Sequence, residues 1–365
     1  MITLPISTTS ISGGRVNSAN KLDFYVTGSL TGVQFWRTGY MKNGRHPDNS
    51  FGNSKKYNFL NAGIRGGVTY KITGRHYATL NGFYMTRAPF FTNSFVSPKV
   101  RDDVVPGIQN EKLYGGDVSY VVRYPWLKAR LTYYCTQFLD ASEIQSFYHD
   151  DLLTYVNFIL TGVNKFHQGI EFGAEVKVIK SLSLFGVAAV GDYRYTSRPT
   201  ATISADNCSI PDITTTAYLK NFYVPTTPQT ALSGGLKFNY KFWYVDVSAN
   251  YYDNSWLDFN PERRTEAAIA NLGPGDPKIA EITQQQRLKG GFTLDASIGK
   301  SIRIKKVVFL NINASMTNVL NNQNIQSGGY EQNRFDFVNQ DINKFPPKYY
   351  YYYGRTFFIN ISLRY

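Results

Sequence analysis

The segment His149-Asp150-Asp151 places an imidazole next to two carboxyl groups, which are residue types that carry out general acid–base chemistry. Alternating polar and apolar residues flank the segment on both sides, so we expect it at the tip of a long hairpin. A solvated polar tip explains the same residues more simply, because no second cluster of acids or histidine completes a site. We favour the solvated tip and predict no catalytic residue, and a rim active site at these three positions is the alternative.

Other residues that could carry chemistry are sparse. Asp102-Asp103 pairs two carboxyl groups without the further ligands that a cation site needs. Cys135 and Cys208 give neither a disulfide framework nor a metal-binding spacing, and Cys135 lies on the apolar side of a strand pattern. Motifs of serine hydrolases, zinc proteases, P-loop proteins and dinucleotide-binding proteins do not occur. We predict no metal site, no cofactor and no enzymatic activity.

The composition indicates a β-rich protein with many aromatic residues, including 28 Tyr, 25 Phe and 30 Gly. No apolar run approaches the roughly 18 residues of a membrane helix, whereas a barrel strand needs only about 9–11 alternating residues. The formal net charge is +13, but Lys and Arg are dispersed and form no compact aromatic and basic stripe, so we expect no nucleic acid partner. Composition alone leaves both a membrane barrel and a soluble β protein open.

The segment Gly354–Tyr365 shows the clearest alternation in the chain. Successive side chains of a strand point to opposite faces, so this segment should have one apolar face and one mostly polar face. The apolar parity holds Phe357, Ile359, Ile361, Leu363 and Tyr365. A transmembrane barrel can use such a strand to close its sheet, because unpaired backbone groups cannot face lipid.

Similar alternation recurs along the whole chain, in segments that begin near residues 22, 58, 76, 112, 129, 153, 182, 232, 243, 288 and 308. Short turns and long connections alternate between these segments, which is typical of outer-membrane barrels. The less apolar faces carry charges such as Glu171, Glu175 and Asp295, which suit a wet lumen better than a dry core. We predict an all-β fold, an antiparallel transmembrane β-barrel sheet of about twelve strands.

Four stretches are similar to motifs of one family of outer-membrane proteins. Gly169-Ile170-Glu171-Phe172 is similar to the Gly-Val-Glu of a long mid-barrel strand, and Arg87-Ala88-Pro89-Phe90 to the outer end of another. Thr317-Asn318-Val319-Leu320-Asn321 is similar to the Asn-Leu-Phe-Asn element before the last external loop, and the terminal strand to a barrel-assembly signal. With these four stretches in this order along the chain, residues 20–365 resemble the C-terminal part of a TonB-dependent outer-membrane receptor of the Bacteroidota type.

The resemblance implies a barrel of about 22 strands that an N-terminal plug fills, with this chain as the second half. Residues 1–20 show no signal peptide pattern, and we expect them to be an irregular lead-in to barrel residues 21–365. On this view the chain is a fragment without a plug. The implied location is the outer membrane, and the implied partners are its lipid, the barrel-assembly machinery, TonB through a plug, and a surface lipoprotein.

The resemblance also implies import of a scarce nutrient, such as a metal chelate, a glycan or a peptide. Its ligand would meet the long loops, at residues 88–106, 196–228, 257–284 and 320–353. Aromatic side chains there could stack on a ligand and arginines could meet anionic groups. The candidate residues are Trp256, Arg263, Arg264, Tyr330 and Arg334. The same residues could simply pack the loops together, and a passive porin, a barrel enzyme and a soluble β protein are the alternatives.

Overall fold

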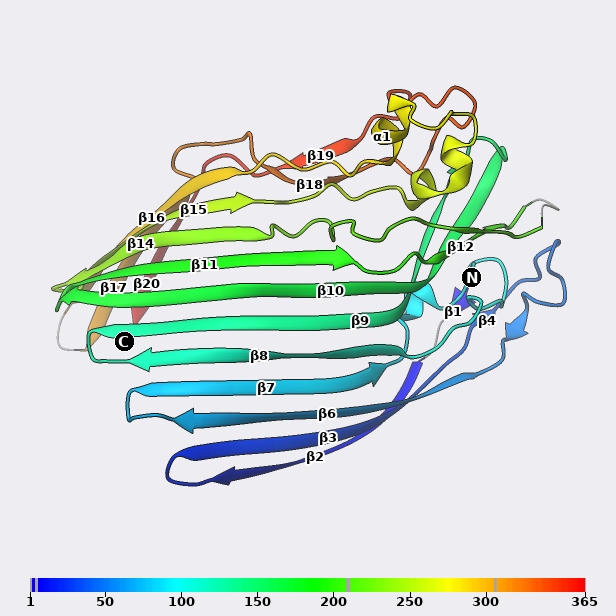
Figure 1. The fold of residues 1–365 in the computed structure, drawn as a ribbon. Coiled ribbons are helices and arrows are strands. Elements are labelled where there is room, and N and C mark those ends of the chain that lie inside the picture. The colour runs from blue at the N-terminus through cyan, green and yellow to red at the C-terminus, as the bar shows by residue number, and fades with distance from the viewer. Residues whose placement is uncertain (1, 4–5, 208–210, 305–306, 365) are drawn as a thin grey trace.

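The computed structural model describes residues 2–3, 6–207, 211–304 and 307–364. One large antiparallel sheet dominates the described residues (Figure 1). Its strands, in spatial order, are β2 (Ile6–Ser18), β3 (Leu22–Phe35), β6 (Tyr57–Lys71), β7 (His76–Arg87), β8 (Glu111–Arg123), β9 (Leu127–His149), β10 (Thr154–Ile179), β11 (Leu182–Tyr195), β14 (Thr230–Tyr240), β15 (Trp243–Asp253), β16 (Gly291–Ile304), β17 (Val308–Thr317) and β20 (Thr356–Arg364).

All twelve strands expected from the alternation are present in this sheet, and each pairs with its neighbour in the chain. The expectation that residues 1–20 are irregular is wrong for residues 6–18, which form β2 and pair with β3 from Ile6↔Phe35 to Ser18↔Asp23. Ser, Thr and Gly predominate in β2, so it lacks an apolar alternation, and pairing with β3 determines its conformation. Tyr365 lies outside the described residues.

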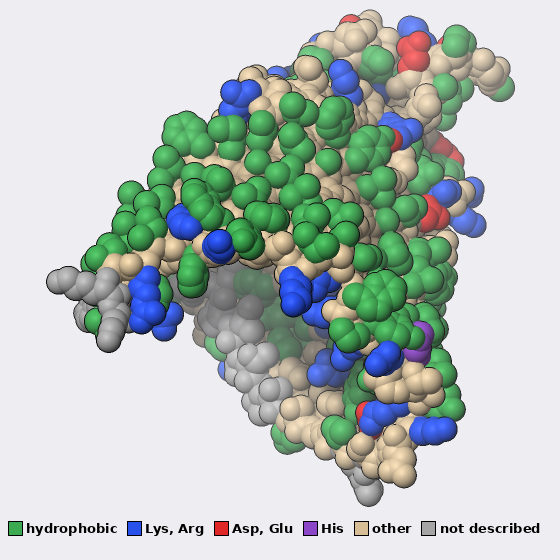
Figure 2. All heavy atoms as spheres, turned by 90° about the vertical axis from the view of Figure 1, so that its left-hand side faces the viewer, with side chains coloured by type: hydrophobic (Ala, Val, Ile, Leu, Met, Phe, Trp, Pro, Cys, Tyr) green, Lys and Arg blue, Asp and Glu red, His purple; other side chains and the backbone are tan. Residues whose placement is uncertain are grey.

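The two faces of the sheet differ in polarity. On the outer face, Ala314 of β17 lies between Ile298 of β16 and Ile359 of β20. One residue away, on the inner face, Asn313 lies between Gly299 and Asn360. Figure 2 shows apolar side chains gathered over the outer face and a hollow on the inner side of the curved sheet. Large apolar residues stay exposed on the outer face of many strands, which a soluble protein would normally bury.

The connections at the two ends of the sheet differ in length. Short turns join the strands at one end, at residues 19–21, 72–75, 124–126, 180–181 and 241–242 (Figure 1, left). Long connections gather at the other end and hold the remaining elements, which are β4 (Thr38–Gly39), β5 (Gly52–Asn53), η1 (Phe91–Asn93), β12 (Thr200–Ala205), β13 (Ile213–Thr216), η2 (Pro261–Arg264), η3 (Glu266–Ile269), α1 (Pro277–Thr283), β18 (Gln326–Tyr330) and β19 (Lys348–Tyr351). The two-residue strand β1 (Ile2–Thr3) pairs with β4.

The hairpin of β9 and β10 extends well beyond its neighbours and supports the long connections. The two strands have 23 and 26 residues, and the outer part of β10 pairs with β12 instead of β11, from Val156↔Ala205 to Thr161↔Thr200. The largest buried apolar cluster lies at this end and contains Phe147, Val156, Phe158, Leu160, Val163, Tyr195, Ala201, Ala217, Leu219 and Phe259. The packed core therefore stabilises the long connections, while the wall of the sheet is one layer thick.

Strands β2 and β20 are the two ends of the sheet, and the described residues give neither of them a second neighbour. Among the described residues, no helix is long and apolar enough to cross a membrane.

Candidate functional site

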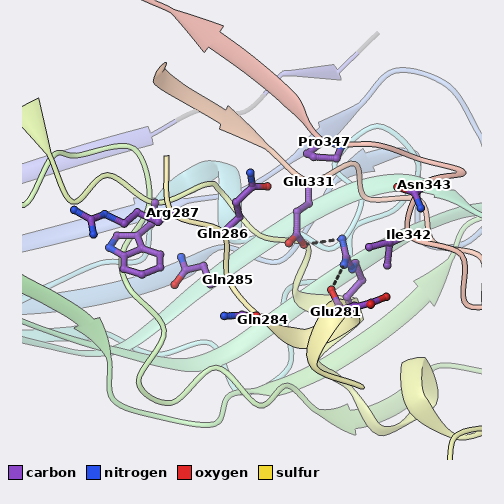
Figure 3. Close-up of a pocket in the computed structure, with 11 residues that line it drawn as sticks. Glu281, Gln284, Gln285, Gln286, Arg287, Glu331, Ile342, Asn343 and Pro347 are labelled. Carbon is purple, nitrogen blue, oxygen red and sulfur yellow. Dashed lines mark hydrogen bonds and ion pairs between the residues drawn. The ribbon is translucent and has the colours of Figure 1, made fainter. Parts of the chain in front are cut away.

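The connections 254–290 and 318–355 enclose a cavity at the long-connection end of the sheet. Its volume is about 450 Å³. Figure 3 shows side chains from both connections around it. The lining residues are Trp256, Arg263, Glu281, Gln284, Gln285, Gln286, Arg287, Glu331, Ile342, Asn343 and Pro347. Two segments about sixty residues apart in the sequence therefore build one site.

A buried carboxylate joins the two connections. Arg264 donates to both carboxylate oxygens of Glu331, and its Nη2–Oε1 distance is 2.9 Å. The backbone N–H of Asn260 donates to the same carboxylate over 2.9 Å, and Arg263 lies 3.4 Å from it. All of these side chains are nearly inaccessible to solvent, and a buried charge needs such partners to offset its lost hydration. Glu331 therefore holds the segment after β18 against the turn η2.

The geometry around η2 places the two arginines differently. Asn260 caps η2 by accepting from the N–H of Glu262, and Pro261 begins the turn. The remaining donors of Arg264 bond to the carbonyls of Asn260, Thr283 and Gln284. Arg263 lines the cavity and donates to the carbonyls of Glu281 and Ile282. Burial lowers the pKa of Arg263 from its usual value, and the nearby Glu331 opposes that shift.

One wall of the cavity is aromatic and carries a donor without an acceptor. The indole of Trp256 stacks on the ring of Tyr223, with 4.2 Å between centroids and 5° between planes. The guanidinium of Arg194 lies over the ring of Tyr223, 4.6 Å from its centroid. The Nε1 of Trp256 is buried and makes no hydrogen bond within the described residues. A buried donor of this kind costs free energy unless a ligand or water accepts from it.

The other wall is polar and close to neutral in charge. Gln285 is held at both ends by the backbone of Tyr223, with distances of 2.8 Å. Gln286 accepts from the hydroxyl of Tyr349, and Arg287 donates to Asp253 over 2.6 Å. A cavity with amide groups, paired charges and one aromatic ring suits a polar ligand that offers several hydrogen bonds and one flat apolar face.

The structure brings together only two of the five loop residues predicted from the sequence. Trp256 and Arg263 line the cavity, whereas Arg264 lies behind its wall, bonded to Glu331. Tyr330 is 41% exposed and lies 6.1 Å from Tyr350, outside the cavity lining. Arg334 donates to both carboxylate oxygens of Asp150 through its Nε and Nη2, and it is not part of the cavity lining.

Sequence reasoning missed most of the cavity residues. Glu331, Glu281, Arg287 and the three glutamines 284–286 line it, and none of them was predicted. The run Gln284-Gln285-Gln286 directly before a strand was the only local signal available. Glu331 gave none, because its role depends on a partner 67 residues away in the chain.

The segment His149-Asp150-Asp151 lies at the tip of the β9–β10 hairpin, but its members point to different partners. The ring of His149 stacks on Phe337, with 4.9 Å between centroids, and its Nε2 lies 2.8 Å from Oε1 of Glu262. Its Nδ1 accepts from the backbone N–H of Leu152 over 3.2 Å. This histidine is buried, with 6% exposure, so the expected solvated tip is wrong for His149. The same burial contradicts an open acid–base site at the rim.

The other residues that the sequence suggests for chemistry make structural contacts or stand alone. Asp102 pairs with the buried Arg37, and Asp103 lies 3.2 Å from Arg101. The described residues contain no group of three or more His, Cys, Asp or Glu side chains that could hold a metal ion. Cys135 is a free thiol in β9, and Cys208 lies outside the described residues.

Asp258 is a carboxyl of this region whose pKa departs clearly from its usual value. Its backbone N–H donates to Gly329 and its carbonyl accepts from Glu331, which places the side chain between the two connections. Burial, followed by the charges of Glu143 and Glu331, raises the pKa of Asp258 to about 6, although the N–H of Phe259 and the charge of Lys165 act in the opposite direction. The neutral form of Asp258 is therefore favoured in the folded loops.

Replacing Asp258 by Asn should stabilise the loops at neutral pH. Because the pKa of Asp258 is raised in the folded state, its contribution to the stability of the loops is fully present below pH 3.8, its usual pKa. This contribution is lost as the pH rises through about 6. Asn does not titrate, so Asp258→Asn should match the native protein near pH 4 and gain about 1–2 kcal/mol of loop stability above pH 7. Amide hydrogen exchange of residues 257–284, corrected for intrinsic rates, measures this difference.

The matched control is Asp341→Asn, which removes an exposed carboxyl from the neighbouring connection. This control variant should give no gain in loop stability that grows with pH. A gain for Asp258→Asn that is equal at pH 5 and pH 7.5 would contradict the raised pKa.

Comparisons with known proteins give the fold and leave the family open. No family model matches the chain, and no curated protein matches it. Among solved structures, the chain is similar to the ferric-catecholate import receptor Fiu from E. coli, with 11% identity, a TM-score of 0.59, and coverage of 100% of this chain and 45% of that one. The copper transporter OprC is 12% identical with a TM-score of 0.65, and the match covers 98% of this chain and 47% of that one. The siderophore receptor PiuA from Acinetobacter baumannii is 11% identical with a TM-score of 0.62, and the match covers 100% of this chain and 44% of that one.

The chain spans less than half of the length of each of these proteins. At this level of identity the likeness concerns the fold. The chain has the antiparallel β-barrel fold of such import receptors, over part of the barrel.

Proposed function

We propose that this chain is part of a TonB-dependent outer-membrane receptor that imports a scarce nutrient. The observation that carries the proposal is the arrangement of the sheet. Its outer face is apolar and exposed, its inner face is polar, and its long connections form a packed platform with a polar cavity at one end. An apolar outer face and a wet inner face are what a bilayer and a lumen require. The similar solved structures are import receptors and transporters, which supports the same proposal.

In this proposal the long connections face outward and the cavity forms part of the ligand vestibule. Trp256 stacks on the ligand, and Arg263 and the glutamines supply hydrogen bonds. Energy would come from TonB acting on a plug domain supplied outside this chain. The terminal strand with Phe357, Ile359, Ile361 and Leu363 would be read by the barrel-assembly machinery, and a surface lipoprotein would be a candidate partner at the loops.

Energised import can be distinguished from passive passage in cells. We expect that deleting the gene region that encodes this chain abolishes uptake of one nutrient from a panel of labelled metal chelates, oligosaccharides and peptides. A protonophore that collapses the inner-membrane gradient should abolish the same uptake in unmodified cells. Uptake that continues with the protonophore would favour a porin, and uptake that survives the deletion would contradict the proposal.

The cavity should determine the affinity for that nutrient. In the same cells, Trp256→Ala should raise the half-saturating concentration by about five- to tenfold, because it removes a stacking surface. Trp256→Phe should restore most of the affinity, because it keeps a flat apolar ring. Tyr330→Ala is the control, since this exposed aromatic residue of the same region lies outside the cavity lining. Equal effects of Trp256→Ala and Tyr330→Ala would contradict the placement of the ligand in the cavity.

A further inference from the structure

The short-turn end of the sheet carries a cluster of cations and aromatic rings on its outer face. The guanidinium of Arg75 lies 4.9 Å from the ring centroid of Tyr124, and that ring lies 5.9 Å from Trp126. His76 connects the cluster to the strands, because its two ring nitrogens lie 2.7 Å and 2.9 Å from the hydroxyls of Tyr120 and Tyr124. The turns 72–75 and 124–126 thus place a cation on an aromatic support.

The next part of the same end repeats this arrangement with other residues. The ammonium of Lys300 lies 4.7 Å from the ring centroid of Trp243 and donates to the carbonyl of Lys241 over 3.0 Å. The ammonium of Lys241 lies 5.2 Å from the centroid of Tyr240. The turn between β14 and β15 brings these groups together, with positive φ angles of 46° at Lys241 and 66° at Phe242. We call the two clusters together the short-turn girdle.

The girdle continues the apolar outer face instead of the polar inner one. Tyr120 has the same parity as the exposed Val118 of β8, and Lys300 has the same parity as the exposed Ile298 and Ile302 of β16. Trp243 is paired with Lys300 across β15 and β16. Its cations therefore stand at the edge of the surface that the proposed function places in lipid. Aromatic rings at such an edge lie at headgroup depth in membrane proteins.

The charge of the girdle is not balanced by carboxylates. Within the described residues, no Asp or Glu forms an ion pair with Arg75, Lys241 or Lys300. Two carboxylates near this end, Asp23 and Glu175, have the parity of the inner face. They lie 2.8 Å from Lys71 and 3.2 Å from Lys237. Figure 2, which faces this end, shows Lys and Arg side chains along the rim of the sheet.

The opposite end of the same outer face shows a different arrangement of charge. There Arg194 lies 2.6 Å from Asp192, and Arg287 lies 2.6 Å from Asp253. Arg194 and Arg287 are thus neutralised within the protein. The girdle cations, which have no carboxylate partner among the described residues, are therefore available to negative charge supplied from outside the protein.

We propose that the short-turn girdle binds the headgroups of anionic phospholipids in the adjacent leaflet. The proposal rests on the placement of the sheet in a bilayer. A phosphodiester headgroup with a net negative charge pairs with each cation, while the rings hold that cation at the depth of the phosphates. Zwitterionic headgroups offer the same phosphate without net charge, so the girdle distinguishes lipids by charge. Part of the formal net charge of +13 then has a function.

Brominated lipids that quench tryptophan fluorescence test this directly. Trp36→Phe with Trp256→Phe leaves Trp126 and Trp243, both within the girdle, as the reporters. The full chain is reconstituted into phosphatidylcholine vesicles that contain the same fraction of either brominated phosphatidylglycerol or brominated phosphatidylcholine. We expect the anionic lipid to quench roughly twofold more strongly at low salt, and the preference to decline as salt screens the charges.

Two triple variants on this background separate charge from aromatic contact. Arg75→Gln with Lys241→Gln and Lys300→Gln should remove the preference. Arg194→Gln with Arg198→Gln and Lys344→Gln removes the same charge from the long-connection end and should preserve it. Equal quenching by both lipids in the parent would overturn the headgroup proposal while supporting the bilayer placement. Absence of quenching by either lipid would overturn both.

Discussion

Glu331→Gln is expected to loosen the packing of the connections 254–290 and 318–355 against each other, with a loss of about 3–5 kcal/mol in local stability. The substitution conserves shape but removes the charge that Arg264 and Arg263 share. Both guanidinium groups would remain buried, and the new amide would turn N–H groups toward donors of Arg264 or Asn260. Uncompensated buried charge is among the largest single penalties that a point substitution can cause.

Hydrogen exchange measures this loss most directly, since local opening differs from global unfolding. Protection should fall in residues 257–284 and 326–347, while the strands β6 to β9 keep theirs. Arg334→Gln is the control, because its pair with Asp150 is exposed on one side and should contribute only about 0–1 kcal/mol. Similar protection in Glu331→Gln and the native chain would contradict the role of this carboxylate.

The strands could be predicted from the sequence because their signal is local. The alternation Ile170, Phe172, Ala174 against Glu171 and Gly173 reports two environments within five residues, and β10 has this register. In β11 the faces could not be assigned, because Leu184 and Val190 point outward while Val187 points to the inner side and all three are exposed and apolar. A wet lumen that tolerates apolar side chains weakens the pattern on which such predictions depend.

The loop site could not be predicted in the same way. His149 and Glu262 lie 113 positions apart in the chain, and Arg334 and Asp150 lie 184 apart, yet both pairs are in contact. Their partners are determined by how the connections pack on the β9–β10 hairpin, which no local pattern encodes. An arginine in a loop therefore suits ligand binding and structural pairing equally well at the level of sequence. The structure distinguishes the two by burial and by partners.

A lysine at Leu30 is expected to destabilise the chain in bilayers by about 2–4 kcal/mol, whereas a lysine at the adjacent Ser29 is expected to change stability by less than about 1 kcal/mol. Leu30 lies near the middle of β3 on the outer face, between Ile11 and Ala62, and is 49% exposed. Ser29 faces the inner side between Ser12 and Gly63, where neighbours are small and an ammonium can reach water.

The two variants place the same charge at adjacent positions of one strand on opposite faces, so their net charge is matched. Denaturant titration of the chain folded into phosphatidylcholine vesicles gives both free energies. The cost at Leu30 arises only if lipid covers the outer face, because an exposed lysine in water costs almost nothing. Equal stabilities for Leu30→Lys and Ser29→Lys would place the outer face in water, and neither the proposed import function nor the lipid contacts of the girdle could then hold.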